Sequence, residues 1–364
     1  MIGNFCGFIY AEYSCPMKAL TYTGVKSISY ESIADPQLLE PTDVIVKTNY
    51  CALCGSDLHV FHGRETGIDL HTAMGHEFTG EIVEMGTKVK AFTRGDMVVS
   101  PFTTACGECF YCKSGLSARC IKNQIYGWVE QGVGLQGAQA EYVRVPLADS
   151  TLIEYEQYGL TGDLALLAGD IFSTGYFGAL LAEIKDDSVV AVVGCGPVGL
   201  MAILAAQLLG ARMVIALDTI EARLKLARTL GAETMLPSGP LETRIHDFTE
   251  GWGVDAVIEA VGNESAQSLA FRLVRPGGIL ATIGVHTTGS FVFKPADVYN
   301  KNLTYKSGRC PARSLMEKTL PLIKKNQALI SPLITHRMSL AAGPLAYDLF
   351  DQKKENCVKI VFEF

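Results

Sequence analysis

The chain lacks several features that would assign it to a special class of proteins. Its 364 residues contain no run of about 18 apolar residues free of charge and glycine, so no transmembrane helix is predicted. Basic side chains number 31 against 38 acidic ones, and the net charge of −7 gives no indication of nucleic-acid binding. No internal repeat or low-complexity tract is present. We therefore expect a soluble, cytoplasmic protein with neither nucleic-acid nor membrane partners.

Two further absences bear on processing and redox chemistry. The first sixteen residues contain no lysine or arginine, and Gly7 interrupts their apolar stretch, so no secretory signal is predicted. We interpret residues 1–16 as an extension ahead of a first strand that begins at Met17. Eleven cysteines are too few for a disulfide scaffold of this length, so their spacing is the more informative feature.

The hydrophobic pattern divides the chain into two parts. Apolar residues make up 48% of the chain, enough for a large core, and roughly 100–200 residues per domain suggests two domains. From Met17 to about Val145, short apolar runs separated by turn residues predict an all-β module. From about Asp170, buried strands alternate with helices, which predicts a parallel, doubly wound α/β sheet. The last predicted elements are a helix over Ser314–Lys325 and a strand over Val358–Phe362.

A glycine-rich turn follows the first strand of the α/β part. The strand Val189–Val193 leads into Gly194-Cys195-Gly196-Pro197-Val198-Gly199, and a helix-compatible run of Ala and Leu follows. In this pattern the first glycine allows the tight turn, the second lets the backbone approach a pyrophosphate, and the third allows close packing of helix on strand. A turn that binds nothing is the alternative. Asp218 favours dinucleotide binding, because it ends the next strand 19 residues after Gly199.

The same strand end bears on the choice of cofactor. A carboxylate at Asp218 would accept hydrogen bonds from the adenosine ribose and repel a 2′-phosphate, which favours NAD over NADP. Arg223 lies five residues further on and could either steady the ribose or attract a phosphate. We therefore expect NAD, with Arg223 as the residue that could alter the preference.

Four cysteines are closely spaced, at positions 106, 109, 112 and 120. Tight turns at Gly107 and Gly115 bring the thiolates of Cys106, Cys109, Cys112 and Cys120 within reach of one tetrahedral zinc ion. Four protein ligands leave no open position, so a structural site is predicted, in a lobe at about residues 100–122. An iron–sulfur cluster or two disulfides are the alternatives, although the spacing differs from that of familiar cluster motifs.

A second set of ligand types lies further toward the N-terminus. Cys54 opens the run Cys-Gly-Ser-Asp-Leu-His, and 22 residues later His76 stands in Gly75-His76-Glu77-Phe78-Thr79-Gly80. With Gly86 and Val89, the four-cysteine lobe and the glycine-rich turn in this order, the chain resembles the zinc-dependent alcohol dehydrogenases of the medium-chain dehydrogenase/reductase superfamily. The resemblance extends from Met17 to Phe364.

The resemblance implies a domain organisation. A GroES-like catalytic domain would occupy residues 17–170, a Rossmann cofactor domain residues 171–309, and residues 310–364 would return to the catalytic domain. It also implies a catalytic zinc on Cys54, His76 and a third ligand just before Thr174-Gly175. Liver-type enzymes have cysteine there, whereas this chain has Asp170 and is similar to bacterial secondary-alcohol and glutathione-independent formaldehyde dehydrogenases. The expected cofactors are NAD and two zinc ions per chain.

The resemblance also assigns roles to neighbouring residues. Asp57 would hold the second ring nitrogen of His76, and a proton would leave through Ser56 and His59. Glu77 would lie beside the metal, either as a transient ligand during ligand exchange or with a purely electrostatic role. Ser56 and His59 could instead be a helix cap and a surface imidazole. Lys359 would lie near the cofactor pyrophosphate. The complete set of expected cofactor-binding residues is Thr174, Gly194, Gly196, Pro197, Val198, Gly199, Asp218, Arg223 and Lys359.

The function implied is reversible hydride transfer between NAD and a small alcohol, aldehyde or ketone by a homodimer or homotetramer. Within the superfamily, a polyol or threonine dehydrogenase is the alternative. Members that lack the catalytic ligands are zinc-free enone reductases, and some related folds are non-enzymatic binding proteins. The presence of Cys54, His76 and Asp170 together argues against both of these.

Overall fold

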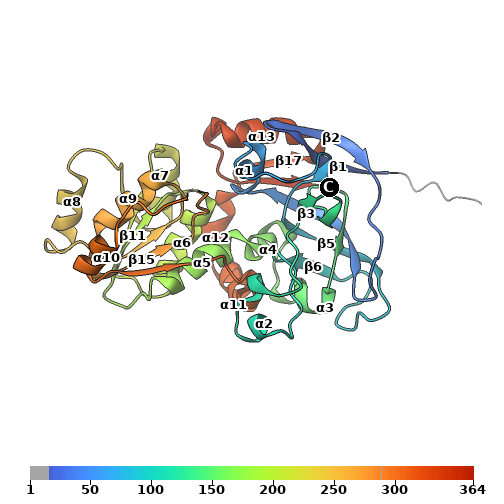
Figure 1. Ribbon diagram of the computed structural model, residues 1–364, viewed down its shortest axis with the longest axis horizontal. Coiled ribbons are helices and arrows are strands. Elements are labelled where there is room, and N and C mark those ends of the chain that lie inside the picture. Colours follow the sequence, from blue (N-terminus) through green and yellow to red (C-terminus); the bar gives the residue numbers. More distant parts are fainter. Residues whose placement is uncertain (1–15, 288) are drawn as a thin grey trace, which may run out of the picture.

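The computed structural model describes residues 16–287 and 289–364, so the expected N-terminal extension lies outside these residues except for Pro16. Two halves of different architecture lie side by side along the long axis of the molecule (Figure 1). One is rich in antiparallel strands and the other holds a parallel sheet between helices, as predicted from the change in hydrophobic pattern.

The β-rich half is built around β3 (Val44–Leu53), which pairs with β5 (Glu77–Met85), β9 (Tyr142–Val145) and β18 (Ile360–Glu363). The sheet runs in the order β10-β6-β5-β3-β18-β17, so the end of the chain returns to the first half. The other strands here are β1 (Met17–Gly24), β2 (Ser27–Ile33), β4 (Thr72–Ala73), β6 (Met97–Ser100), β7 (Trp128–Glu130), β8 (Val133–Leu135), β10 (Ile153–Glu154) and β17 (His336–Ser339). The helices are α1 (Asp57–Phe61), α2 (Phe110–Lys113), α3 (Ala148–Thr151), α12 (Gln327–Ile330) and α13 (Gly343–Asp351).

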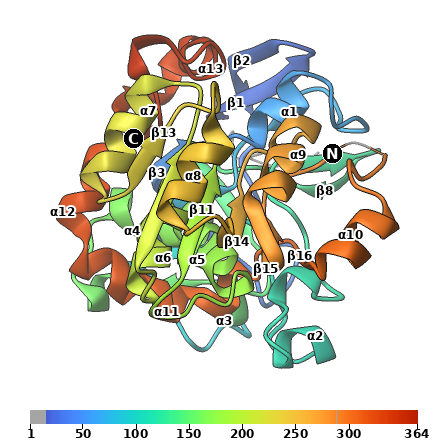
Figure 2. The ribbon, with the colours of Figure 1, turned by 90° about the vertical axis from the view of Figure 1, so that its left-hand side faces the viewer.

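The second half contains a six-stranded parallel sheet in the order β13-β12-β11-β14-β15-β16. Numbered within the domain this is 3-2-1-4-5-6, the doubly wound order of dinucleotide-binding folds. The strands are β11 (Val189–Val193), β12 (Met213–Leu217), β13 (Glu233–Met235), β14 (Val254–Glu259), β15 (Val274–Thr282) and β16 (Thr304–Ser307). The helices are α6 (Pro197–Leu208), α7 (Glu221–Thr229), α8 (Leu241–Phe248), α9 (Glu264–Leu273) and α10 (Pro295–Lys301). Figure 2 views the molecule from this side.

Alternate residues of β11 enter two cores on opposite faces of the sheet. Val190 and Val192 pack with α6 and α7, whereas Val189, Ala191 and Val193 pack with α8 and α9. A strand buried on both faces needs an uninterrupted apolar sequence, and this explains the run Val-Val-Ala-Val-Val.

Three helices join the halves: α4 (Gly162–Gly169), α5 (Ile171–Leu181) and α11 (Ala312–Lys325). Their apolar residues share one buried cluster with β11 and with strand residues of the β-rich half. The chain bends by 42° between α4 and α5, and Asp170 occupies the bend. Gly169 permits it, because a Cβ there would lie 2.2 Å from the carbonyl oxygen of Ser100. Of the described helices none is by itself long and apolar enough to cross a membrane, although the bent pair α4 and α5 meets that test of length and composition.

Candidate active site

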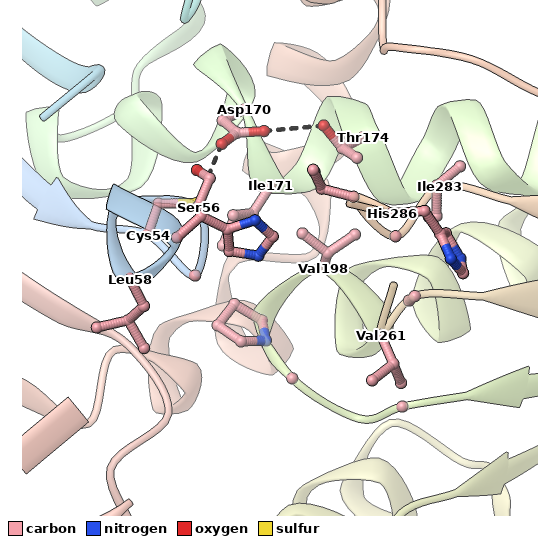
Figure 3. Close-up of a pocket in the computed structure, with 18 of the residues that line it drawn as sticks. Cys54, Ser56, Leu58, Asp170, Ile171, Thr174, Val198, Val261, Ile283 and His286 are labelled. Carbon is pink, nitrogen blue, oxygen red and sulfur yellow. Dashed lines mark hydrogen bonds between the residues drawn. The ribbon is translucent and has the colours of Figure 1, made fainter. Parts of the chain in front are cut away.

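A cleft of about 1250 Å³ is lined by residues of both halves. It reaches the carboxyl ends of β11 and β14, where the strand order of the parallel sheet reverses, the usual position of ligands in such sheets. Its volume exceeds the roughly 300–1,000 Å³ of a pocket for one small ligand, which leaves room for a dinucleotide and a second molecule. Figure 3 shows Cys54, Ser56 and Asp170 toward one end of the cleft and Val261, Ile283 and His286 toward the other.

Three side chains predicted to bind a catalytic zinc meet in this cleft. Cys54 follows β3, His76 precedes β5, and Asp170 lies between α4 and α5. The Asp170 Oδ2 atom is 3.3 Å from Cys54 Sγ and 3.2 Å from His76 Nε2. Together with Glu77, these residues offer ligand atoms that all lie within 4.8 Å of one another. The antiparallel pairing of Ala52 with Glu77 explains how residues so far apart in sequence become neighbours.

The chemistry of these groups fits a zinc ion. A thiol, an imidazole and a carboxylate are zinc ligands, and three protein ligands leave one position open. Burial and the Asp170 carboxylate raise the pKa of Cys54 to about 11. Burial opposes protonation of His76, yet the carboxylates of Asp57 and Asp170 raise its pKa well above the usual value. A buried divalent cation would replace the protons held by these groups and relieve the repulsion among them.

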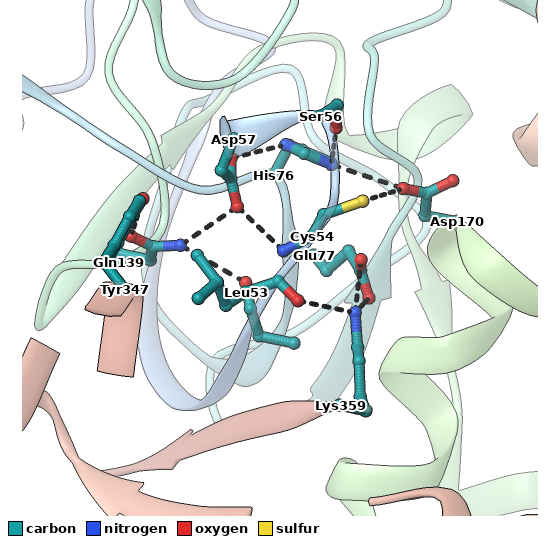
Figure 4. A network of polar contacts seen from close by, with 11 residues as sticks. Leu53, Cys54, Ser56, Asp57, His76, Glu77, Gln139, Asp170, Tyr347 and Lys359 are labelled. Atoms are coloured by element: carbon teal, nitrogen blue, oxygen red, sulfur yellow. Dashed lines mark hydrogen bonds and ion pairs between the residues drawn. The ribbon is translucent and has the colours of Figure 1, made fainter. Parts of the chain in front are cut away.

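Further hydrogen bonds hold the three groups in place (Figure 4). Asp57 Oδ1 lies 3.3 Å from His76 Nδ1, which leaves Nε2 facing Cys54 and Asp170. The other oxygen of Asp57 accepts hydrogen bonds from the backbone N–H of Cys54 at 2.9 Å and from the amide of Gln139 at 3.3 Å. The hydroxyl of Thr174 donates to Asp170 Oδ1 at 2.9 Å. Neighbours thus orient the side chains of His76 and Asp170 and the backbone of Cys54.

The glycine-rich turn has the expected shape. Gly194 has a φ of +94°, which an L side chain rarely adopts, and a Cβ on Gly199 would lie 1.8 Å from the Gly194 carbonyl oxygen. A Cβ on Gly196 would meet only Arg223 Nη1, at 3.8 Å, so the backbone here is open to the cleft. Pro197 stands in the first turn of α6, where no backbone N–H is needed, and Val198 lines the cleft beside Thr174.

Comparisons with known proteins agree with this geometry. The alcohol dehydrogenase GroES-like domain family matches residues 40–155, and the zinc-binding dehydrogenase family matches residues 197–325. The chain is 42% identical over 360 residues to zinc-type alcohol dehydrogenase B of Aspergillus flavus, covering 95% of this chain and 81% of that protein. The chain belongs to the zinc-type alcohol dehydrogenases.

Solved structures support the assignment of this dehydrogenase. An alcohol dehydrogenase from Thermus sp. ATN1 superposes with a TM-score of 0.88 at 35% identity, covering 95% of this chain and 99% of that one. A zinc-binding dehydrogenase from Sinorhizobium meliloti bound to NADP superposes with a TM-score of 0.82 at 27% identity, covering 96% and 100%. The predicted family, the combination of GroES-like and Rossmann domains, and the oxidoreductase activity are confirmed.

In the dehydrogenase, the four cysteines of the lobe form a second group that could hold a metal ion. The sulfur atoms of Cys106, Cys109, Cys112 and Cys120 all lie within 4.8 Å of one another, and four thiolates around zinc are about 3.8 Å apart. Backbone N–H groups of Cys112 and Ile121 lower the pKa of Cys109 to about 6. These residues fit a tetrahedral zinc ion with no open position.

Asp218 and Arg223 lie together at the far end of the cleft. The Asp218 carboxylate accepts hydrogen bonds from the backbone N–H groups of Cys195 at 2.8 Å and Ile220 at 2.9 Å. Arg223 Nη1 lies 3.7 Å from Asp218 Oδ2. The charge of the arginine is thus partly balanced by the carboxylate, and both side chains line the cleft.

The positions of Ser56 and His59 argue against the simpler roles considered for them. Ser56 precedes α1 but makes no capping hydrogen bond, and its hydroxyl lies 3.3 Å from His76 Nε2. His59 lines the cleft half-buried, and its Nδ1 atom is buried without a partner among the described residues. Burial lowers the pKa of His59, so the ring is neutral and able to accept a proton at pH 7.

Lys359, which is expected near the cofactor pyrophosphate, lines the cleft but makes its contacts with Glu77 and Leu53. Lys359 is 0% exposed, and its ammonium group contacts the Glu77 carboxylate at 2.6 and 2.7 Å and the Leu53 carbonyl oxygen at 3.1 Å. The cause is the pairing of β18 with β3, which sets Ile360 opposite Leu53. Lys359 therefore balances the charge of Glu77 beside the metal-binding group (Figure 4).

Several cleft residues were not predicted from the sequence. His286 Nε2 lies 2.8 Å from Glu259 Oε2, and the other oxygen of Glu259 accepts hydrogen bonds from the backbone N–H groups of Val261 and Gly262. Glu259 is the last residue of β14 and His286 follows β15, and this position is a signal that could have identified them, because ligands bind at that edge of a parallel sheet. Arg119 and Arg309 also line the cleft, and no motif includes them.

Proposed function

We propose that the protein catalyses NAD-dependent interconversion of a small alcohol and its aldehyde or ketone, with two zinc ions per chain. The observation that carries this proposal is the meeting of Cys54, His76 and Asp170 in a cleft that also contains the glycine-rich turn. An open metal position beside a dinucleotide site is what hydride transfer from an alcohol requires.

Some residues of the site would orient the zinc ligands, and others would transfer the substrate proton. Bound zinc would act as a Lewis acid that lowers the pKa of a hydroxyl group, and bound NAD would accept the hydride. Asp57 fixes the ring of His76, and Thr174 fixes the carboxylate of Asp170. Ser56 stands beside His76 and would take the substrate proton, and His59 would pass it toward solvent.

A zinc assay and a substrate panel test this function together. Two zinc ions per chain and NAD reduction with primary or secondary alcohols are expected. Turnover of polyols or threonine alone would favour the polyol or threonine dehydrogenase alternative. One zinc ion, no alcohol oxidation and reduction of enones would contradict the proposal.

We expect kcat/KM with NAD to exceed that with NADP by on the order of a hundredfold. The Asp218 carboxylate cannot donate a hydrogen bond to a 2′-phosphate, and it would repel the phosphate in a partly desolvated site at a cost of a few kcal/mol. Each 1.4 kcal/mol changes the ratio of kcat/KM about tenfold. Steady-state kinetics with both cofactors measure the ratio. An Asp218→Ser variant should have a smaller ratio, because Arg223 loses its carboxylate partner and can bind the 2′-phosphate of NADP. A preference of the unaltered enzyme for NADP would instead mean that Arg223 governs the pocket.

Replacing His59 with glutamine should lower kcat near neutral pH by on the order of a hundredfold, the lower end of what general acid–base groups contribute. Glutamine keeps the size of the side chain but cannot accept a proton. Activity should recover in part as pH rises or when amine buffers are added. His62→Gln is a control, because this nearby histidine pairs with Asp351. An unchanged pH profile in His59→Gln would remove His59 from the proton path.

We also propose that the protein is a cytoplasmic homo-oligomer, either a dimer or a tetramer. Support comes from β16, which is the last strand of the parallel sheet among the described residues, and from exposed aromatic residues in the same region, Phe291 and Tyr299. Free edges and exposed apolar side chains favour association. Light scattering coupled to size-exclusion chromatography distinguishes monomer, dimer and tetramer.

A further inference from the structure

Two arginine side chains line the cleft without an ion pair. Arg119 belongs to the four-cysteine lobe, and Arg309 follows β16. Within residues 16–287 and 289–364, neither guanidinium has a carboxylate within 4.0 Å or a side-chain hydrogen bond, whereas Arg144, Arg275 and Arg337 all pair with acids. Two unpaired cations facing one cleft leave it with an unmatched positive charge.

Both arginines lie at the metal end of the cleft. Arg309 precedes Cys310, a buried residue whose cluster packs against Phe102, and the ring of Phe102 lies edge-on to His76 at 6.4 Å. The lobe is held against the same segment, because the Ser314 backbone N–H donates to the Ser117 hydroxyl at 3.4 Å. Arg119 is therefore close to Arg309, and partial burial, together with repulsion from Arg119, lowers the pKa of Arg309.

The charges around this end do not cancel. Glu65 attracts the guanidinium group of Arg309. This single carboxylate cannot balance the charges of two guanidinium groups. Asp57 and Asp170 are already bound to His76 and its neighbours. Apolar and aromatic side chains also line the cleft, among them Phe102, Ile125 and Trp128. The metal end thus combines the candidate zinc ligands, apolar side chains and two arginines that have no ion pair among the described residues.

We propose that the substrate is an alcohol or carbonyl compound that carries an anionic group, a carboxylate or a phosphate, which Arg119 and Arg309 bind. Guanidinium groups make paired, charge-assisted hydrogen bonds to both anions, and Arg119 and Arg309 are exposed, so that an anion can reach them. The two arginines would hold the anion while the hydroxyl carbon lies beside Cys54, His76 and Asp170. This inference rests on the proposed dehydrogenase function and specifies its substrate class.

The cofactor pyrophosphate is the other anion that enters the cleft, and its site lies elsewhere. It would be met by the turn Gly194–Gly199 and the start of α6, which supply backbone N–H groups. If the two arginines served the cofactor, their loss would raise KM for NAD. If they serve the substrate, KM for NAD should stay unchanged.

The test compares ω-hydroxycarboxylates of four to eight carbons with the neutral ω-hydroxyamides of equal length, with matching hydroxyalkyl phosphates as a third series. We expect kcat/KM to favour the charged series by about a hundredfold at the best length, about tenfold for each charge-assisted contact. The preferred series identifies the anion.

Arg119→Gln and Arg309→Gln should each reduce the preference for charged substrates about tenfold, because KM of the charged substrate alone rises. Arg244→Gln on α8 is the control and should leave this preference unchanged. Calorimetric titration with the unreactive dicarboxylates of matching length should show weaker binding in the two cleft variants.

The outcomes separate the two proposals. Oxidation of neutral alcohols with no preference for either charged series would overturn the anionic substrate and leave the dehydrogenase function intact. A rise in KM for NAD in the arginine variants would also overturn it. Failure to oxidise any compound of the three series, or simple alcohols, with NAD would overturn the proposed function itself.

Discussion

Replacing Asp170 with alanine should abolish alcohol oxidation and release about one of two zinc ions per chain. Asp170 contacts both Cys54 and His76, so its loss removes one of three candidate ligands and leaves their sulfur and nitrogen atoms without a common partner. Charge stabilisation by a metal is worth several kcal/mol, so kcat/KM should fall by about 10³-fold or more. Atomic emission spectroscopy and steady-state kinetics measure the two effects.

Two further variants make this result specific. Asp187→Ala removes an exposed carboxylate between α5 and β11 and should retain both zinc ions and full activity. Cys109→Ser should lose the other zinc ion and lower the melting temperature, because metal binding in the lobe contributes to folding. If Asp170→Ala kept two zinc ions and normal activity, the assignment of the catalytic metal site would be wrong.

Local patterns account for what could be predicted from the sequence. The turn Gly194–Gly199 and the four-cysteine lobe consist of residues close in sequence, and their spacing reflects local geometry directly. The uninterrupted apolar run Val189–Val193 likewise predicts a strand buried on both faces. Asp170 is different, because an aspartate between two apolar helices has no local signature, and only the family resemblance identified it.

Contacts between distant strands account for what could not be predicted. The environment of Lys359 depends on the register of β18 against β3, 306 residues apart at the Leu53 contact, and no pattern in the last strand reveals it. Gln139, which joins Asp57 to the Tyr347 hydroxyl, is another such residue. Arg119 and Arg309 acquire a common role only when the lobe packs against the segment after β16.

The buried pair of Lys359 and Glu77 should have a large effect on stability. Both side chains are 0% exposed, and the ammonium group lies 2.6 Å from the carboxylate. Removing one partner of a buried ion pair leaves an uncompensated charge and costs about 3–5 kcal/mol. We therefore expect Lys359→Met to lower the free energy of unfolding by about that amount, measured by urea denaturation at pH 7.

The double variant Lys359→Met/Glu77→Gln distinguishes charge from packing. It removes both charges at nearly constant volume, so much of the stability lost in Lys359→Met should return, as replacement of a whole buried pair is often close to neutral. Lys225→Met, on the exposed face of α7, is the control and should change stability by less than about 0.5 kcal/mol. Losses that simply add in the double variant would show that Lys359 and Glu77 act independently. Recovery would instead show that the two charges stabilise each other, so that Lys359 offsets the charge of Glu77 beside the candidate metal ligands.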